Sequence, residues 1–256
     1  MNISYHQFIL FFLIFARIAT ILVTVPFFGF QTIPIKVKAG LATVITLLMF
    51  SFIEPYQGPI PLNLIPFIIM VINEVMIGLI IGFTAGIIFI GIQFAGQLIG
   101  LDMGFGIVNV IDPQSGENVS IIGQFKYLLA ILLFMCLDGH LFLIRALKLS
   151  YEAIPVSRNV LLDTDVVSKL ISMSSNIFVI AIKIGSAALA ALFITSFVMG
   201  VIARMVPQMN IFIVGFPLKI SVGFIMIILT LPFFMYMFGK LYNLFERDIV
   251  EIIQLM

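Results

Sequence analysis

The sequence has few charged residues and one cysteine, and both shortages exclude classes of protein. Charged side chains make up 10% of the 256 residues, against about 25% in a soluble domain. The 13 basic and 12 acidic residues include no lysine or arginine run that could neutralise a row of phosphates, so we expect no nucleic-acid partner. Cys136 has no second cysteine for an internal disulfide, and we expect it to be a small buried hydrophobic residue.

Sequence motifs of catalysis are also missing. The chain has no HExxH, GxSxG, P-loop or paired-cysteine pattern, so we expect no enzyme, no cofactor and no metal site. The run Asp138–Gly139–His140 places a carboxylate and an imidazole two residues apart. On a helix these two side chains do not share a face, so the run is weak support for a proton relay.

Apolar residues dominate what is present. They make up 62% of the chain, and the mean hydropathy is +1.25. No packing in water could hide so much apolar surface, so lipid or other subunits must surround much of it. We predict an all-α fold, a membrane-associated bundle of long bent helices and helical hairpins. Hydropathy predicts about six spans, at Phe8–Phe30, Gly40–Ile53, Pro61–Leu101, Tyr127–Leu137 with its flank to Ile144, Ile184–Ala203 and Ser221–Gly239.

Several of these segments carry further expectations. Phe8–Phe30 is a poor cleavable signal peptide, because no basic residue precedes its apolar stretch, and we expect it to remain as the first helix. Pro61–Leu101 is too long for one straight crossing, so it is either a helical hairpin or a helix that continues beyond the bilayer. Pro207 and Pro217 should break Ala203–Ile220 into a re-entrant bend. Lys240–Met256 is predicted to be an amphipathic helix.

Two charges stand alone in long apolar segments, Arg17 in the first and Glu74 in the third. Charges at such depth are costly, and they usually pair or face a watery cavity. One interpretation is a role in transport. The other, which we favour, is a buried ion pair or a helix that does not lie in lipid.

Glycines recur at intervals of four residues in two places. Each set forms a smooth stripe on a helix, where another backbone can approach closely. Such stripes would serve packing against other subunits or packing within this chain, and the sequence leaves both open. The two sets are Gly78, Gly82 and Gly86, and then Gly96, Gly100 and Gly104.

Several stretches together resemble the FliR family of bacterial flagellar export-gate proteins and its injectisome counterparts. The most specific is ARMVPQMNIF at 203–212 followed by GFPLKI at 215–220, a predicted bend that includes Arg204, Pro207, Gln208, Asn210, Pro217 and Lys219. The others are QFAGQLIG at 93–100, MGFG at 103–106, DPQSG at 112–116 and LDGH at 137–140. These motifs cover the middle and C-terminal thirds of the chain.

The resemblance implies a structural component of the flagellar type III protein export gate in the bacterial inner membrane, within the flagellar basal body. Family members assemble with FliP and FliQ into a channel that works with FlhB and passes unfolded flagellar proteins. The whole chain would then be a single export-gate domain, with residues 1–150 FliP-like and residues 151–256 FliQ-like. Much of the assembled core would lie above the membrane plane that hydropathy indicates.

The resemblance also implies that the loop within 102–120 plugs the closed channel. The plug would be Met103, Gly104, Phe105, Gly106, Ile107, Val108 and Asn109, with Asp112 and Pro113 in the turn that anchors it. Flexible glycines beside bulky apolar residues suit a movable plug. The alternative is a loop that only joins two helices on the outside.

A small-solute secondary transporter is the alternative function, because broken helices and buried charges also form transporter sites. Such a protein should work alone and contain inverted repeats, and the sequence has no convincing repeat. An enzyme ranks third, for want of a catalytic constellation.

Overall fold

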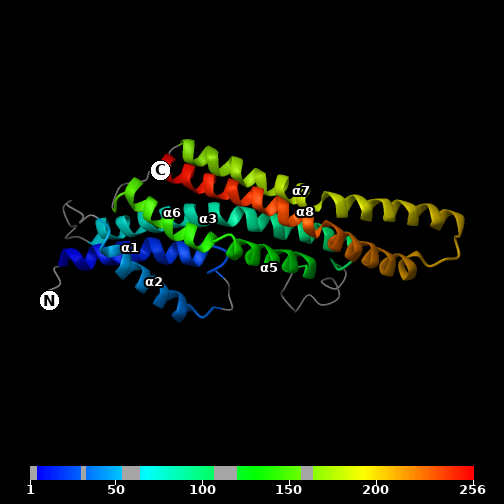
Figure 1. The fold of residues 1–256 in the computed structure, drawn as a ribbon, viewed down its shortest axis with the longest axis horizontal. Helices are drawn as coiled ribbons and strands as arrows, with labels where there is room; N and C mark the ends of the chain where they lie inside the picture. Colours follow the sequence, from blue (N-terminus) through cyan, green and yellow to red (C-terminus); the bar gives the residue numbers. More distant parts are fainter. Residues whose placement is uncertain (1–4, 30–32, 54–63, 107–119, 157–163) are drawn as a thin grey trace. The chain divides into compact units, whose positions relative to one another are not determined.

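The computed structural model describes residues 5–29, 33–53, 64–106, 120–156 and 164–256. Within these ranges the chain is helical and has no strand, so the predicted all-α class is confirmed (Figure 1). The helices are α1 (Tyr5–Thr24), α2 (Ile35–Phe50), α3 (Leu64–Met103), α5 (Ile121–Cys136), α6 (Gly139–Ala153), α7 (Thr164–Met205) and α8 (Ile211–Leu255).

Three of the helices are far longer than a bilayer requires. α3 has 40 residues, α7 has 42 and α8 has 45. At 1.5 Å per residue each is about 60 Å or more in length, roughly twice the hydrocarbon thickness. Of the two alternatives for Pro61–Leu101, the structure therefore has the continuing helix and not the hairpin, since α3 runs unbroken from Leu64 to Met103.

Four helices in the described part of the chain are long and apolar enough to cross a membrane, namely α1, α3, α7 and α8. The pair α5 and α6 would make a fifth if the two helices form one bent span. The number of candidate spans is below the predicted six because α2 has 16 residues, fewer than the about 20 that a membrane span needs.

The bend expected within 203–220 is a short turn. α7 ends at Met205, residues 206–210 form the turn, and α8 begins at Ile211, so the two helices form a hairpin. Pro207 lies in this turn, whereas Pro217 lies inside α8 and does not end it. A proline inside a helix removes one backbone hydrogen bond and kinks the helix, and the hydrogen bonds on either side continue it.

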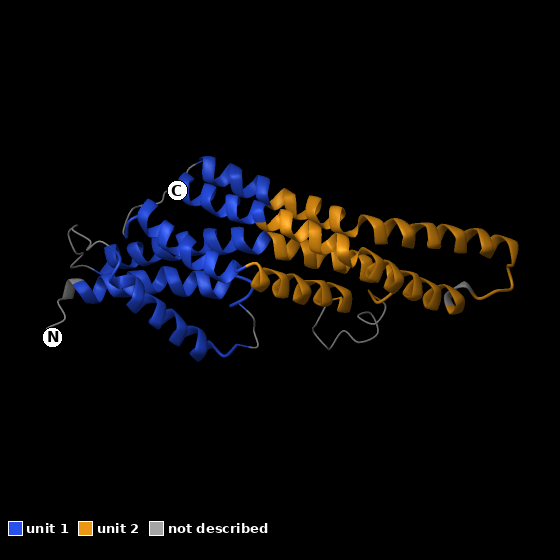
Figure 2. Ribbon diagram, in the orientation of Figure 1, with its two compact units in different colours: residues 1–87, 138–173, 243–256 blue, residues 88–137, 174–242 orange. Residues whose placement is uncertain are grey.

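The chain divides into two compact units, shown in Figure 2. Unit 1 consists of residues 1–87, 138–173 and 243–256, and unit 2 consists of residues 88–137 and 174–242. Each unit contains residues from both of the expected parts, 1–150 and 151–256. The division into a FliP-like and a FliQ-like part rests on the resemblance alone and stays a prediction.

Each unit has its own apolar core. In unit 1 the fully buried side chains include Leu13, Ile14 and Ile18 of α1 and Ile77 and Ile81 of α3. The C-terminal end of α8 contributes the apolar face expected of the tail, with Phe245, Ile249, Ile252 and Ile253 buried. In unit 2 one core cluster contains Ile99, Met103, Ile122, Ala188, Leu192 and Ile227.

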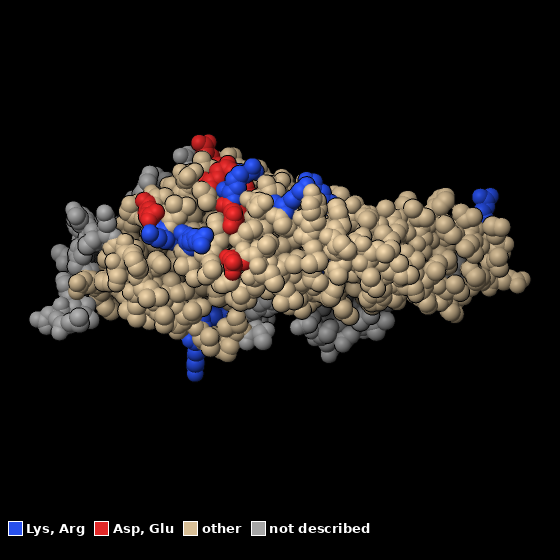
Figure 3. Space-filling model, in the orientation of Figure 1, with Lys and Arg blue, Asp and Glu red and all other residues tan. Residues whose placement is uncertain are grey.

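Much apolar surface stays exposed. Phe193 and Phe197 of α7, and Ile213 and Leu229 of α8, are each exposed by two thirds or more. Most of the face shown in Figure 3 carries no charged side chain. Cys136 is exposed as well, at the last turn of α5, so the expectation that it is buried was wrong. A surface of this kind needs lipid or another subunit to cover it.

Candidate functional site

The lone charges of the first and third apolar segments meet in unit 1. Arg17 Nε lies 2.6 Å from Glu74 Oε2, and both side chains are fully buried. The other guanidinium nitrogens donate to backbone carbonyls at the end of α6, from Nη1 to Ser150 O at 3.0 Å and from both Nη1 and Nη2 to Ile154 O at 3.1 Å. One side chain of α1 therefore fastens α3 and α6 together.

The end of α6 is suited to receive a cation. The last carbonyls of a helix lack partners within the helix and carry the negative end of its dipole. Ile154 is the residue directly after the last turn of α6, so the guanidinium of Arg17 caps this end. The ring of Tyr151 lies 4.2 Å from the same guanidinium, and its hydroxyl donates to Ile14 O at 3.0 Å.

This arrangement holds α1, α3 and α6 together. A guanidinium stays protonated in proteins, and that of Arg17 is already bound to a carboxylate, two carbonyls and an aromatic ring. Sequence reasoning singled out Arg17 and Glu74 because they are lone charges. It missed Ser150, Tyr151 and Ile154, whose part in the cluster depends on the position of α6 and leaves no signal in the sequence.

The first glycine stripe brings α1 close enough to α3 for this ion pair. A Cβ atom at Gly78 would lie 2.8 Å from Thr20 Cβ and 3.0 Å from Arg17 O, and one at Gly82 would collide with the Thr24 hydroxyl. The hydroxyls of Thr20 and Thr24 each donate to a backbone carbonyl of α1, so both are satisfied within their own helix. Gly86 is buried on the same stripe. The contacts of Gly78 and Gly82 lie within this chain.

The second glycine stripe brings two helix backbones into contact in unit 2. A Cβ atom at Gly96 of α3 would lie 2.5 Å from Gly123 Cα and 2.8 Å from Gly123 N. At Gly100 it would collide with the hydroxyl of Ser120, the residue before α5. Backbones of α3 and α5 therefore touch directly. Sequence reasoning missed the partners Ser120 and Gly123, which are two small residues three positions apart at the start of α5.

The first part of the expected plug loop is a helix end anchored on α8. Gly104 has a φ of 97°, a conformation that favours glycine, and Phe105 N donates to Gly100 O at 3.0 Å, which closes the end of α3. A Cβ atom at Gly104 would lie 2.6 Å from the ring of Phe216. The plug candidates Ile107, Val108, Asn109, Asp112 and Pro113 lie outside the described residues.

Two apolar contacts extend this anchor along α8. Met103 is fully buried against Gly223, where a Cβ atom would lie 2.5 Å from the methionine sulfur. The ring of Phe105 lies 6.4 Å from that of Phe224, nearly edge to face. The start of the loop, Met103–Phe105, is thus held against α8.

The residues of the motif at 203–220 lie around the turn between α7 and α8. Arg204, Pro207, Gln208 and Asn210 are exposed there, and Lys219 is half-buried two turns into α8. The Asn210 carbonyl accepts the first backbone bonds of α8, from Ile213 N at 3.1 Å and Val214 N at 3.4 Å. The motif therefore marks a helix start at an exposed turn.

The run Asp138–Gly139–His140 marks the break between α5 and α6. Asp138 adopts the left-handed conformation, with a φ of 57°, and the Nδ1 atom of His140 is buried without a hydrogen-bond partner among the described residues. No group of three or more His, Cys, Asp or Glu side chains that could hold a metal occurs in the described ranges. The run shapes the helix break.

Comparison with known proteins decides the family. The sequence profile of the family described as "Bacterial export proteins, family 1" matches residues 8–245. The chain belongs to this family. It is 35% identical over 234 residues to the flagellar biosynthetic protein FliR of Bacillus subtilis strain 168, covering 90% of this chain and 89% of that protein.

Further relatives agree. FliR of Pectobacterium carotovorum is 33% identical over 251 residues, covering 94% of this chain and 93% of the relative. FliR of Escherichia coli K12 is 29% identical over 240 residues, covering 92% of this chain and 91% of the relative. The FliR resemblance drawn from the motifs is thereby confirmed. Its family and its apolar helices make the chain a membrane-embedded component of flagellar export.

Proposed function

We propose that the chain forms, with FliP and FliQ homologues, the channel of the export gate through which unfolded flagellar proteins pass. The observation that carries this proposal is the exposed apolar surface of α7 and α8 in a member of an export-protein family. α7 and α8 have 42 and 45 residues, about twice the length that spans the hydrocarbon of a bilayer, so lipid alone does not cover the whole of this surface. We place the complex in the bacterial inner membrane, in the flagellar basal body, in contact with an FlhB homologue.

The alternative of a small-solute transporter loses its best candidate site. A transporter would use lone buried charges as a binding site at the middle of the membrane. The hydrogen-bond donors of Arg17 instead bind Glu74 and the end of α6, which leaves no place for a solute. We therefore assign this pair a structural role, and we propose no catalytic role for the chain.

Expression with and without partners tests the proposal. Produced alone in detergent, the chain should aggregate or be degraded, because its exposed apolar helices find no partner. Co-expression with FliP and FliQ homologues should yield a stable complex whose intact mass includes all three proteins. A monodisperse, thermally stable monomer that does not co-purify with either partner would overturn the proposal.

A deletion tests the proposed plug. We propose that the loop expected at Met103–Asn109 blocks the central path at rest, with Met103, Gly104 and Phe105 holding its start on α8, Ile107–Asn109 entering the path, and Asp112 and Pro113 in the anchoring turn. Deleting Ile107–Asn109 keeps Gly104 and Phe105, which close the end of α3. Cells that produce the complete complex with this deletion should leak small ions and grow poorly, while the complex still assembles.

The matched control is a deletion of Asn159–Leu161, which also removes three residues between helices. Ion flux into vesicles that contain the purified complexes gives the comparison. A normally assembled complex without Ile107–Asn109 that conducts no more than the control would show that the loop is an external connection.

A further inference from the structure

One face of α2 is left uncovered by the described part of the chain. The opposite face packs in unit 1, where Ala42 and Thr46 are buried and the ring of Phe50 lies 6.4 Å from that of Phe11 in α1. The uncovered face carries an apolar stripe at helical spacing. Its members are Val37, Leu41, Val44 and Leu48, which are 57%, 37%, 54% and 60% exposed.

Lys36 and Lys38 flank this stripe at its N-terminal end. They precede and follow Val37, and at about 100° per residue they leave the helix on either side of it. Neither forms an ion pair with a carboxylate among the described residues, and α2 itself contains no acidic residue. On the face shown in Figure 3, the described basic side chains at this end of α2 have no acidic side chain beside them.

The stripe has the length of one leaflet of a bilayer. At 1.5 Å per residue, the distance along the helix from Val37 to Leu48 is about 16 Å, against roughly 15 Å for half of the hydrocarbon core. The whole of α2 has 16 residues, fewer than a membrane span needs. Both lengths suit a helix that enters one leaflet and has its two lysines at the surface of that leaflet.

We propose that α2 enters one leaflet, with its apolar stripe against the acyl chains and with Lys36 and Lys38 bound to the phosphates of anionic phospholipids. A lysine can lay its apolar stem along such a surface while its ammonium reaches the headgroups. Positive charge near the membrane surface selects anionic lipid. The inference requires that the chain is embedded in a membrane, and it does not require that the chain forms the channel.

The flanking lysines favour lipid over a partner helix as the cover of the stripe. A helix packed there would take the two ammonium groups out of water, which is costly unless the helix also supplies an anion for each of them. A leaflet surface supplies both water and phosphate. The four side chains of the stripe are valine and leucine, and none of them can hydrogen-bond to a neighbouring helix in the membrane.

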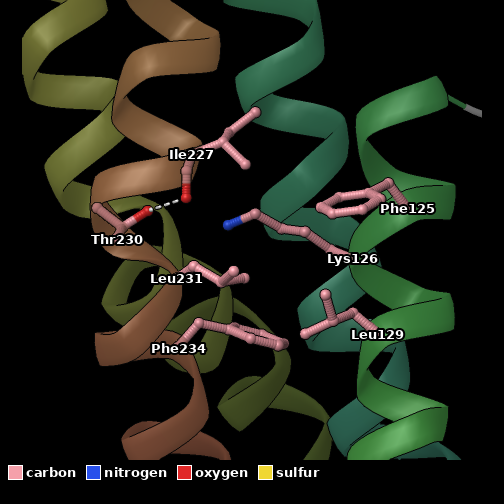
Figure 4. Close-up of a pocket in the computed structure, with 7 residues that line it drawn as sticks. All are labelled: Phe125, Lys126, Leu129, Ile227, Thr230, Leu231 and Phe234. Carbon is pink, nitrogen blue, oxygen red and sulfur yellow. Dashed lines mark hydrogen bonds between the residues drawn. The ribbon is translucent and has the colours of Figure 1, made fainter.

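Lys126 of α5 provides a contrast in unit 2. It is buried, and the centroid of the Phe234 ring lies 5.7 Å from its Nζ atom. Figure 4 shows its ammonium pointing from α5 toward the turn of α8 that carries Ile227 and Thr230. A lysine held between two helices in this way cannot reach a lipid headgroup. Exposure, and not the mere presence of lysine in an apolar segment, therefore distinguishes the pair on α2.

Tryptophan fluorescence locates the stripe, because the chain has no tryptophan of its own. Val37→Trp and Leu48→Trp are each purified with the proteins that co-purify with the chain, whose tryptophans are replaced by phenylalanine, and are returned to phosphatidylcholine vesicles. Lipid brominated near the headgroup should quench Val37→Trp more strongly, and lipid brominated near the chain end should quench Leu48→Trp more strongly. Acrylamide in the water should quench Leu48→Trp little.

Three results would overturn this location. Strong quenching of both variants by acrylamide would show that the stripe faces water. Quenching by neither acrylamide nor brominated lipid would show that another protein helix covers the stripe. The same depth for both variants would show that α2 lies along the membrane surface and does not enter the leaflet.

The headgroup preference tests the two lysines. In phosphatidylcholine vesicles, brominated phosphatidylglycerol should occupy the site beside Val37→Trp with at least about fivefold higher affinity than brominated phosphatidylcholine, at low ionic strength. Replacing both Lys36 and Lys38 with glutamine should abolish this preference. Added salt should weaken it in the chain that keeps both lysines, because salt screens exposed charges.

Two further variants serve as controls. Lys183→Gln removes an exposed lysine of α7 and should leave the preference unchanged. Glu54→Gln should also leave it unchanged, since Glu54 follows the opposite end of α2 in the sequence. A preference that survives the loss of both Lys36 and Lys38 would show that they do not bind phosphate. A preference that arises only in Glu54→Gln would show that the chain's own carboxylate occupies the lysines.

Discussion

Replacing Glu74 with alanine is expected to lower the free energy of unfolding by about 3–5 kcal/mol, because it leaves the guanidinium of Arg17 buried without its carboxylate. Replacing Arg17 with alanine should be at least as harmful. That change removes the ion pair and also uncovers the carbonyls of Ser150 and Ile154 at the end of α6. Thermal unfolding of the purified complex and the yield of protease-resistant chain measure both effects.

Three further variants separate charge pairing from general damage. Glu74→Gln keeps an oxygen that can accept a hydrogen bond from Arg17 Nε, so it should lower the free energy of unfolding by less than Glu74→Ala does. Arg17→Lys keeps the positive charge but should still lower the stability. A single ammonium cannot bind the carboxylate and two carbonyls in the geometry of a guanidinium. The double variant Arg17→Ala with Glu74→Ala should be no worse than the worse single variant. Additive losses would show that the two residues act independently.

An exposed ion pair of the same chain serves as the control. Lys148 and Glu152 lie 3.5 Å apart on α6, and their side chains are 58% and 59% exposed. Glu152→Ala should change stability by no more than about 0.5 kcal/mol, because water screens such pairs. A loss as large as that from Glu74→Ala would mean that burial does not decide the effect.

Replacing Gly96 with alanine is expected to destabilise the complex by about 3 kcal/mol, the upper end of the usual cost of overpacking. The added methyl group would meet the backbone of Gly123 at 2.5 Å from Cα and the carbonyl of Ile122 at 2.9 Å. A side chain could rotate away, but a helix backbone cannot, so α3 and α5 would have to separate. The apparent melting temperature and the assembly yield of the complex report the change.

Two other glycines provide graded controls. At Gly100 the collision is with the Ser120 hydroxyl, a small side chain that can turn, so Gly100→Ala should be milder than Gly96→Ala. At Gly200 of α7 no atom lies within 4 Å of an added Cβ. Gly200→Ala should therefore be neutral or stabilise by about 0.5–1 kcal/mol, since alanine favours a helix more than glycine does. Equal losses at Gly96 and Gly200 would contradict the close backbone contact.

Some features follow from the sequence by itself. A composition with 62% apolar and 10% charged residues can fold only with lipid or other subunits around it, and that predicts the all-α membrane class. The absence of charge from long segments marked Arg17 and Glu74 as exceptions. The motifs at 93–116 and 203–220 predicted the FliR family, which the comparisons confirmed.

Other features were decided only by the tertiary structure. Hydropathy cannot tell a hairpin from one helix that continues, because both are apolar throughout, so only the packed structure shows α3 as a single helix of 40 residues. Glycine spacing predicts close approach but not the partner, and the partners are Thr20, Thr24, Ser120 and Gly123. Which carbonyls Arg17 binds depends on which helix ends meet, and that is set by contacts between residues far apart in the chain.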